Sequence, residues 1–176
     1  MAMYLPSGQR WTLQTHYTNT SEETLYVQDA YEIEVMLVGD VREWAAAWFM
    51  GTDEVVVPVG TSSMRVECAW PHDFSLLSVW GHLHEWGSAI RFERESGDGW
   101  ETVYDVPTWD PEWTNNANPE YHDAWAFPVV EGERFMVTCS WDNTTGSDLA
   151  FPSEMCGVLG VGHGARDAIN CNGTIQ

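Results

Sequence analysis

The chain has 176 residues, with 7 Lys and Arg against 27 Asp and Glu, and a formal net charge of −20 at pH 7. This length suits one domain with a substantial core, and the acidic surface repels phosphates, so we expect no nucleic acid partner. Aromatic residues make up 13% of the chain, which indicates a packed globule, and no apolar run approaches the roughly 18 to 20 residues that cross a bilayer. We therefore expect no membrane span.

Short alternating or apolar segments, each bounded by turn residues, predict β-strands along most of the chain. In chain order they are residues 11–17, 31–38, 54–59, 64–70, 75–87, 89–94, 100–106, 134–141 and 157–161. Residues 41–50 (VREWAAAWFM) contain three alanines that favour a helix, while the flanking aromatic residues fit a strand as well. About nine short strands without βαβ alternation predict an all-β fold, a two-sheet antiparallel sandwich of jelly-roll type.

The four cysteines are Cys68, Cys139, Cys156 and Cys171. They form no CxxC pair, and an even number in a β-rich chain predicts two disulfides and an oxidising location, either secreted, periplasmic or otherwise extracytoplasmic. Their spacing leaves three connectivities open. Residues 1–10 show no signal-peptide pattern. Either a signal has been removed or residues 1–176 are a single domain of a longer parent chain, and the abrupt strand-like start at Trp11 favours the second.

Two histidines in GHLHEWG (81–87) are candidate metal ligands. His82 and His84 project from the same face of a strand, about 6.5 to 7 Å apart, and can converge on one ion. Two solvated histidines on a wet strand face are the alternative. Met155 lies beside Cys156 in FPSEMCGVLG (151–160), where it either fills a core gap or joins the pair. Two imidazoles and a thioether suit copper, especially Cu(I).

Three motifs, GHLHEWG, CSWDNTTGSDLAFPSEMCG and LQTHYTN, resemble the copper type II, ascorbate-dependent monooxygenases, the group of peptidylglycine α-hydroxylating monooxygenase and dopamine β-monooxygenase. They occur in the family's order, and the resemblance runs from about Gln14 to Cys171. It implies the C-terminal, jelly-roll-like catalytic domain, in which His82, His84 and Met155 hold the oxygen-activating copper. By the same resemblance, the disulfides are Cys139–Cys156 and Cys68–Cys171.

The resemblance also implies a second copper site in a preceding N-terminal domain. His16 in LQTHY matches the last of its three histidine ligands, but the neighbouring histidine pair upstream does not occur in this sequence, so His16 alone cannot build that site. A solvated histidine on the first strand is the other interpretation of His16. We expect His72, His122 and His163 to be solvated or hydrogen-bonded.

The positions that bind the substrate carboxylate in peptide-amidating members differ here. The resemblance places an arginine two residues before the first histidine, and an asparagine and a tyrosine after the EMC cysteine, whereas this chain has Trp80, Gly157 and Leu159. The bidentate grip on a carboxylate is therefore missing, and a glycine-extended peptide is not the expected substrate. Trp80 and Trp86 would give the site an aromatic rim for a small apolar or aromatic substrate, unless both belong to the core.

The resemblance implies hydroxylation of an unactivated C–H bond by O2, with copper cycling between Cu(I) and Cu(II) and with ascorbate or another electron donor. Because one copper supplies one electron per cycle and the reaction needs two, we expect the domain to turn over poorly or not at all without its N-terminal partner. Two alternatives remain, namely a copper-binding or electron-transfer module without hydroxylase activity, and a jelly-roll carbohydrate-binding domain.

Overall fold

The structure, a computed structural model, describes residues 1–10, 15, 17, 19, 21–97 and 99–175. Strands dominate this part of the chain, and its helices are two single 3-10 turns, η1 (Val38–Asp40) and η2 (Pro111–Thr114). Within the described residues, no helix has the length and hydropathy needed to span a bilayer. His16 lies outside the described residues.

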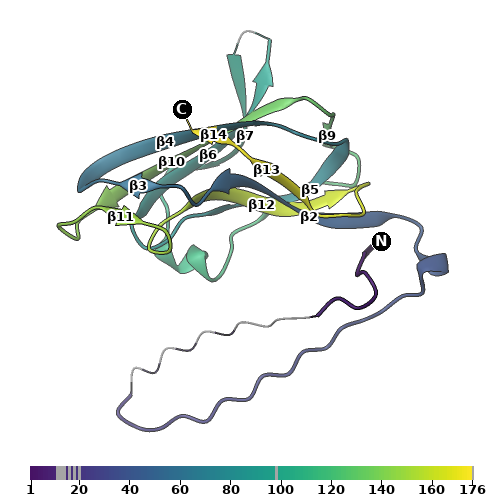
Figure 1. The fold of residues 1–176 in the computed structure, drawn as a ribbon, viewed down its shortest axis with the longest axis horizontal. Coiled ribbons are helices and arrows are strands. Elements are labelled where there is room, and N and C mark those ends of the chain that lie inside the picture. The colour runs from purple at the N-terminus through teal and green to yellow at the C-terminus, as the bar shows by residue number, and fades with distance from the viewer. Residues whose placement is uncertain (11–14, 16, 18, 20, 98, 176) are drawn as a thin grey trace.

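Two β-sheets form the body of the molecule, and Figure 1 shows them as two stacked layers. The first sheet has the order β1-β2-β12-β5-β8, with β13 added to the edge of β2 and β9 to β5; the second has the order β14-β4-β10-β6-β7; β11 and β3 pair separately. The first sheet contains β1 (Ala2–Met3), β2 (Trp44–Thr52), β5 (Phe74–His82), β8 (Glu120–Tyr121), β9 (Pro128–Val129), β12 (Cys156–His163) and β13 (Ile169–Asn172). The second contains β4 (Gly60–Ala69), β6 (Gly87–Ser96), β7 (Gly99–Val106), β10 (Arg134–Asn143) and β14 (Thr174–Ile175), and the small pair is β3 (Val56–Val57) with β11 (Leu149–Ala150).

The long strands pair antiparallel, as predicted, and among the described residues parallel pairing is confined to β1 and β13 on the edge of β2. The predicted all-β antiparallel sandwich is therefore confirmed. Strand β2 settles residues 44–50 of the ambiguous segment 41–50 as a strand, whereas residues 41–43 belong to no strand or helix. Because β2 pairs with β12 from Ala45 to Thr52 and buries Trp48 and Met50, tertiary packing overrides the helix preference of its alanines.

Aromatic side chains fill the space between the two sheets. Trp48 of β2 stacks on Phe92 of β6, with ring centroids 5.8 Å apart, and meets Trp70 edge-on at 5.6 Å. Phe92 in turn stacks on Phe135 of β10 at 5.1 Å. Offset-stacked and edge-on pairs are the favoured arrangements of buried aromatic rings, so this cluster fixes how the first sheet lies on the second.

Both disulfides cross the sandwich. Cys139 of β10 pairs with Cys156 of β12, and Cys68 of β4 pairs with Cys171 of β13, with Cα–Cα distances of 5.8 Å and 5.9 Å. Each bond joins a strand of the second sheet to a strand of the first. The pairing that the family resemblance implies is confirmed, and paired cysteines of this kind are typical of an oxidising compartment.

The segment between β1 and β2 does not join either sheet. Residues 21–37 contain no strand and are exposed, and Figure 1 shows them looping away from the sandwich before the chain returns at β2. The strand predicted for residues 31–38 is therefore wrong. Its alternating side chains, including Ile33 and Val35, have no sheet to pack against and its backbone has no partner strand, and both are needed for a strand to form. We call residues 21–38 the apolar arm.

Candidate metal centre

The two candidate histidines lie where β5 gives way to a turn. His82 is the last residue of β5, and His84 belongs to the turn that leads into β6, so the strand predicted across residues 75–87 is interrupted after His82. The alternation of faces continues nevertheless, because Leu83 is fully buried while both histidines are half-buried. Their ring centroids are 5.2 Å apart. Two imidazoles that bind one ion through nitrogen atoms at about 2.0 Å have centroids roughly 5 to 6 Å apart, so the pair is spaced for a chelate.

A hydrogen bond fixes which nitrogen of His84 is free. The Nδ1 atom lies 3.2 Å from the backbone carbonyl oxygen of Ser153. A carbonyl oxygen can only accept, so Nδ1 carries the proton and donates it, which leaves the lone pair of a neutral ring on Nε2. Metal-bound histidines are commonly oriented in this way by a carbonyl or carboxylate behind them. His84 is therefore held in the tautomer that presents Nε2 as a ligand.

The environment of His82 favours its neutral form. Burial lowers the pKa of His82 below its ordinary value, and the neighbouring His84 ring lowers it further. Only the neutral imidazole has a lone pair for a metal, and a lowered pKa keeps that form populated to a lower pH. The site thus presents His82 as a ligand without a proton to displace at neutral pH.

Met155 lies directly before β12, the strand next to β5, and its side chain is on the histidine face of the sheet. In the antiparallel ladder of β12 and β5, Gly157 is the partner of His82. Side chains of paired residues share a face, and Met155 precedes Gly157 by two residues, so its side chain leaves the sheet on the histidine side.

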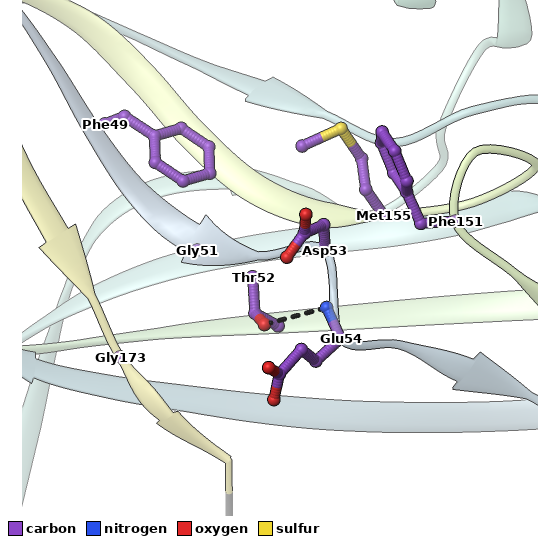
Figure 2. Close-up of a pocket in the computed structure, with 8 residues that line it drawn as sticks. All are labelled: Phe49, Gly51, Thr52, Asp53, Glu54, Phe151, Met155 and Gly173. Atoms are coloured by element: carbon purple, nitrogen blue, oxygen red, sulfur yellow. Dashed lines mark hydrogen bonds between the residues drawn. The ribbon is translucent and has the colours of Figure 1, made fainter.

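The thioether of Met155 points into a groove on the β2 side of β12. Figure 2 shows its sulfur between the rings of Phe49 and Phe151. Neither histidine lines this groove. Its lining residues are Phe49, Gly51, Thr52, Asp53, Glu54, Phe151, Met155 and Gly173. The structure therefore does not bring the thioether together with the two imidazoles: sharing an ion with them would require the Met155 side chain to turn out of this groove and the Phe49 ring, which covers Gly157, to move aside.

Several hydrogen bonds hold the turn that carries His84. The indole Nε1 of Trp109 donates to the His84 carbonyl oxygen at 3.1 Å, and the hydroxyl of Thr114 donates to the Leu83 carbonyl oxygen at 2.9 Å. Both donors come from the segment after β7, for which the sequence predicts only a turn-rich connection. The turn is therefore fixed by distant residues that no local pattern could have identified.

One more residue near the histidines was missed by sequence reasoning. The side chain of Glu154, directly before Met155, is completely buried and accepts hydrogen bonds from the backbone N–H groups of His84 and Trp86. A buried carboxylate is rare in proteins. Its place inside the EMC motif was the only sequence signal available for it.

The expected aromatic rim is present in part. Trp80 and Trp86 are both half-buried, so neither belongs wholly to the core. Trp80 lies two residues before His82 on the same face of β5 and opposite Leu159 of β12, which itself lies opposite Phe49 of β2. Phe49 was not singled out by the sequence. Together these three side chains form a half-exposed apolar row beside the histidines.

The other histidines in the described residues differ in their surroundings. The Nε2 atom of His122 is buried and has no hydrogen-bond partner there, contrary to the expectation that this ring is solvated or hydrogen-bonded. His72 is exposed, whereas His163 is fully buried and its Nε2 lies 2.6 Å from a carboxylate oxygen of Glu43. Over the described ranges, no group of three or more His, Cys, Asp or Glu side chains is placed to hold a metal ion. The candidate centre is of another kind, with two imidazoles and a thioether.

Comparison with known proteins adds no assignment: no protein-family model and no curated protein sequence matches this chain.

Proposed function

We propose that this chain is the copper-binding, oxygen-activating domain of a copper-dependent monooxygenase, with His82, His84 and Met155 as ligands. The observation that carries the proposal is the histidine pair. The two rings are 5.2 Å apart, and the Ser153 carbonyl leaves the Nε2 of His84 free to coordinate. Two imidazoles with a neighbouring thioether form a soft donor set that suits copper over zinc, magnesium or calcium.

Bound copper would supply one-electron redox chemistry and an open position for O2. The residues of this chain would orient and tune it. His84 is held in one tautomer by Ser153, and His82 is kept neutral by its half-buried position. The thioether of Met155 would favour the reduced ion. Two imidazoles and one thioether leave room in a four-coordinate site for a further ligand.

The surface beside the histidines favours an apolar or aromatic substrate. Trp80, Leu159 and Phe49 follow one another across three neighbouring strands on the histidine face. None of the three can pair with a substrate carboxylate, which needs a cationic, hydrogen-bonding partner. We therefore propose a small organic substrate whose reacting C–H bond is presented by apolar contact with this row.

The reaction that we propose needs two electrons, and one copper supplies one. The proposal therefore includes a reductant such as ascorbate and a partner domain that holds the second copper, to which His16 would contribute. The two disulfides fit a protein that works in an oxidising, extracytoplasmic compartment, where thiols pair and stay paired. We propose that the protein is exported to such a compartment.

The decisive test is copper K-edge absorption on the reduced protein. We expect about one copper per chain, with two imidazole shells and one sulfur scatterer. His82→Ala should abolish tight Cu(I) binding, and Met155→Ile should remove the sulfur shell. His72→Ala and Met36→Ile are matched controls, because both side chains are exposed and lie away from the ligand segments. Loss of copper in the controls alone, or no copper in the wild-type protein, would refute the proposal.

The same material separates the two alternative functions. A copper-binding module without hydroxylase activity would show the expected absorption edge but would oxidise no substrate when reductant, O2 and the partner domain are supplied. A carbohydrate-binding domain would bind glycans through its tryptophans, and that binding would persist after a chelator has removed the metal. Trp80→Ala would leave the copper stoichiometry unchanged in a copper-binding module. The same substitution would weaken glycan binding in a carbohydrate-binding domain.

A further inference from the structure

A hollow lies on the outer face of the second sheet, the face turned away from the first sheet. Its volume is about 490 Å³, within the range of pockets that bind small molecules. Most of its lining residues belong to β4, β6, β7 and β10. On β10, Val137 and Cys139 point into the core, and Thr138 between them lines this hollow. We call it the outer hollow.

A row of polar side chains crosses the outer hollow. Thr138 of β10 is the ladder partner of Arg65 on β4 and of Arg91 on β6, and Arg91 is the partner of Asp105 on β7. Paired residues share a face, so these four side chains leave the sheet side by side. Neighbouring strands are about 4.8 Å apart, and the two arginines therefore flank the Thr138 hydroxyl.

Part of this row is held in a fixed orientation. The Nε and Nη2 atoms of Arg91 donate to the two carboxylate oxygens of Asp105, at 3.1 Å and 3.3 Å. This fork uses two of the five N–H groups of the guanidinium and leaves lone pairs on both carboxylate oxygens. Thr138 and Ser140 add two half-buried hydroxyl groups. The outer hollow can therefore both donate hydrogen bonds to a ligand and accept them from it.

The outer hollow also has an apolar part. Met136 of β10 lines it and is only 4% exposed, and Trp100 of β7 is half-buried. The guanidinium carbon of Arg134 lies 5.8 Å from the centre of the Trp100 ring, and the carboxylates of Glu67 and Glu95 bind that guanidinium. Arg134 is not among the lining residues. It therefore supports the indole from outside, and Trp100 keeps a surface that faces the hollow.

The charges in the outer hollow balance one another. Two arginines, Arg65 and Arg91, and two carboxylates, Glu93 and Asp105, line it, in a chain whose net charge is −20. The field of the whole chain repels anions, and the hollow itself has no excess charge of either sign. A neutral ligand with many hydroxyl groups suits this lining, because each hydroxyl both donates and accepts, and the C–H face of a sugar ring packs against an indole.

We propose that the outer hollow binds a neutral oligosaccharide. Trp100 packs against the apolar face of a sugar ring, while the Arg91–Asp105 pair and the Thr138 hydroxyl bind its hydroxyl groups. This inference does not rest on the proposed copper function, because none of the proposed copper ligands lines the hollow. The histidines lie on the outer face of the other sheet, so the domain could be attached to a glycan while its candidate metal centre stays accessible.

The test is oligosaccharide binding to the full chain in the presence of a chelator. The neutral probes are gluco-, xylo- and manno-oligosaccharides, and the anionic probes are oligogalacturonate and heparin fragments. Calorimetric titration measures each affinity. We expect at least one neutral probe to bind, and to bind more tightly than the anionic probes. No binding of any neutral probe at millimolar concentration, or tighter binding of an anionic probe, would overturn the proposal.

Trp100→Ala removes the proposed aromatic contact. We expect it to weaken binding by at least about 10-fold, because loss of a tryptophan that anchors an interface commonly costs more than a factor of ten. Trp125→Ala is the matched control, since Trp125 is 58% exposed and lies between β8 and β9 of the first sheet. Its affinity should stay within about twofold of wild type. Wild-type affinity in a folded Trp100→Ala protein would contradict the proposal.

A second variant covers the case in which Trp100→Ala does not fold. Thr138→Val removes one hydroxyl and keeps the shape and the strand preference of the residue. We expect binding to weaken by about 3- to 10-fold, as for the loss of one hydrogen bond. Ser63→Ala removes an exposed hydroxyl of β4 outside the hollow and is the control. Equal affinities of these two variants would then refute the proposal.

A third variant separates this site from the functions argued above. Trp80 lies beside the candidate metal centre, where the alternative carbohydrate-binding function would place the sugar. If Trp80→Ala abolishes binding and Trp100→Ala does not, the sugar binds beside the histidines and this inference is wrong. If Trp100→Ala abolishes binding, the inference holds whether or not the chain binds copper, because the chelator keeps copper out of the assay.

Discussion

Gly157 of β12 lies directly opposite His82 of β5 in the ladder that joins the two strands. Because glycine has no side chain, the ring of Phe49 can lie directly over the backbone beside His82, the first candidate ligand. A Cβ at position 157 would lie 2.7 Å from Cε2 of Phe49, closer than real Cβ atoms come to other atoms. The close approach of Phe49 depends on the absence of a side chain here.

Replacing this glycine should therefore damage the site. We expect Gly157→Val to displace the Phe49 ring and to lower the free energy of unfolding by about 1 to 3 kcal/mol, the usual range for overpacking. It should also weaken copper binding, because the added side chain crowds His82. Chemical denaturation and chelator competition measure the two effects. Gly39→Ala is the matched control, since a Cβ at position 39 meets no atom within 4 Å.

Copper itself should stabilise the wild-type protein. A ligand that binds only the folded state adds about 2.7 kcal/mol to the free energy of unfolding when its free concentration is 100 times the dissociation constant. We expect this gain with Cu(I) under anaerobic conditions, and we expect it to disappear in a His82→Ala, His84→Ala double variant. Thermal unfolding with and without metal measures it. An equal gain in the double variant would mean that copper binds elsewhere.

The disulfide next to Met155 should affect both stability and ligation. Cys139 and Cys156 are 17 residues apart in the sequence, and the chain-entropy relation assigns about 3 kcal/mol to a loop of this size. Replacing both cysteines by alanine should lower the free energy of unfolding by about this amount and should weaken the sulfur signal in copper K-edge absorption.

The second disulfide is the control for that experiment. Cys68 and Cys171 close a loop with a separation of 103 residues, which corresponds to about 4.7 kcal/mol, and neither cysteine adjoins a candidate ligand. Removing this bond should destabilise the protein more and disturb the copper signal less. The opposite ranking of the copper signals would show that the Cys139–Cys156 bond does not position Met155.

The lowered pKa of His82 predicts a dependence of stability on pH. Because burial lowers the folded-state pKa, the unfolded chain takes up a proton at this residue first as the pH falls through about 6.5. The unfolded state then binds more protons, so the contribution of His82 is constant above this pH and becomes destabilising between about 6.5 and the folded pKa.

The measurement is urea denaturation of wild type and His82→Gln between pH 8 and pH 5. The difference in unfolding free energy between the two proteins isolates His82 from the many carboxylates that also titrate. We expect wild type to lose stability relative to the variant as the pH falls below about 6.5. A constant difference across the range would show that His82 is not desolvated in the folded protein.

The sequence predicts the fold class well and the local details less well. Alternation and turn residues indicate most of the long strands, because each buries one face against the other sheet. The same alternation in residues 31–38 predicts a strand that does not form, since a pattern records which side chains could be buried and not whether a partner strand exists. For β2, local preference left helix and strand open, and pairing with β12 decided the outcome.

For the candidate site as well, the sequence predicts some features correctly and gives no signal for others. Alternation correctly places His82 and His84 on one face, although His84 lies in a turn and not in the strand. What holds that turn is Glu154, 70 residues away in the sequence, and contacts over such distances leave no periodic signal. The disulfide pairing came from the family resemblance, because four cysteines by themselves allow three connectivities.

The exposure of the apolar arm has a predicted consequence for this protein at high concentration. Its large side chains, from Leu25 to Val38, are exposed, and patches of this kind adhere to one another. A net charge of −20 keeps separate molecules apart, but added electrolyte shortens the reach of that repulsion to about 8 Å at physiological ionic strength. Salt should therefore promote clustering of the purified chain, and dilute, low-salt solutions are where its monomeric properties can be studied.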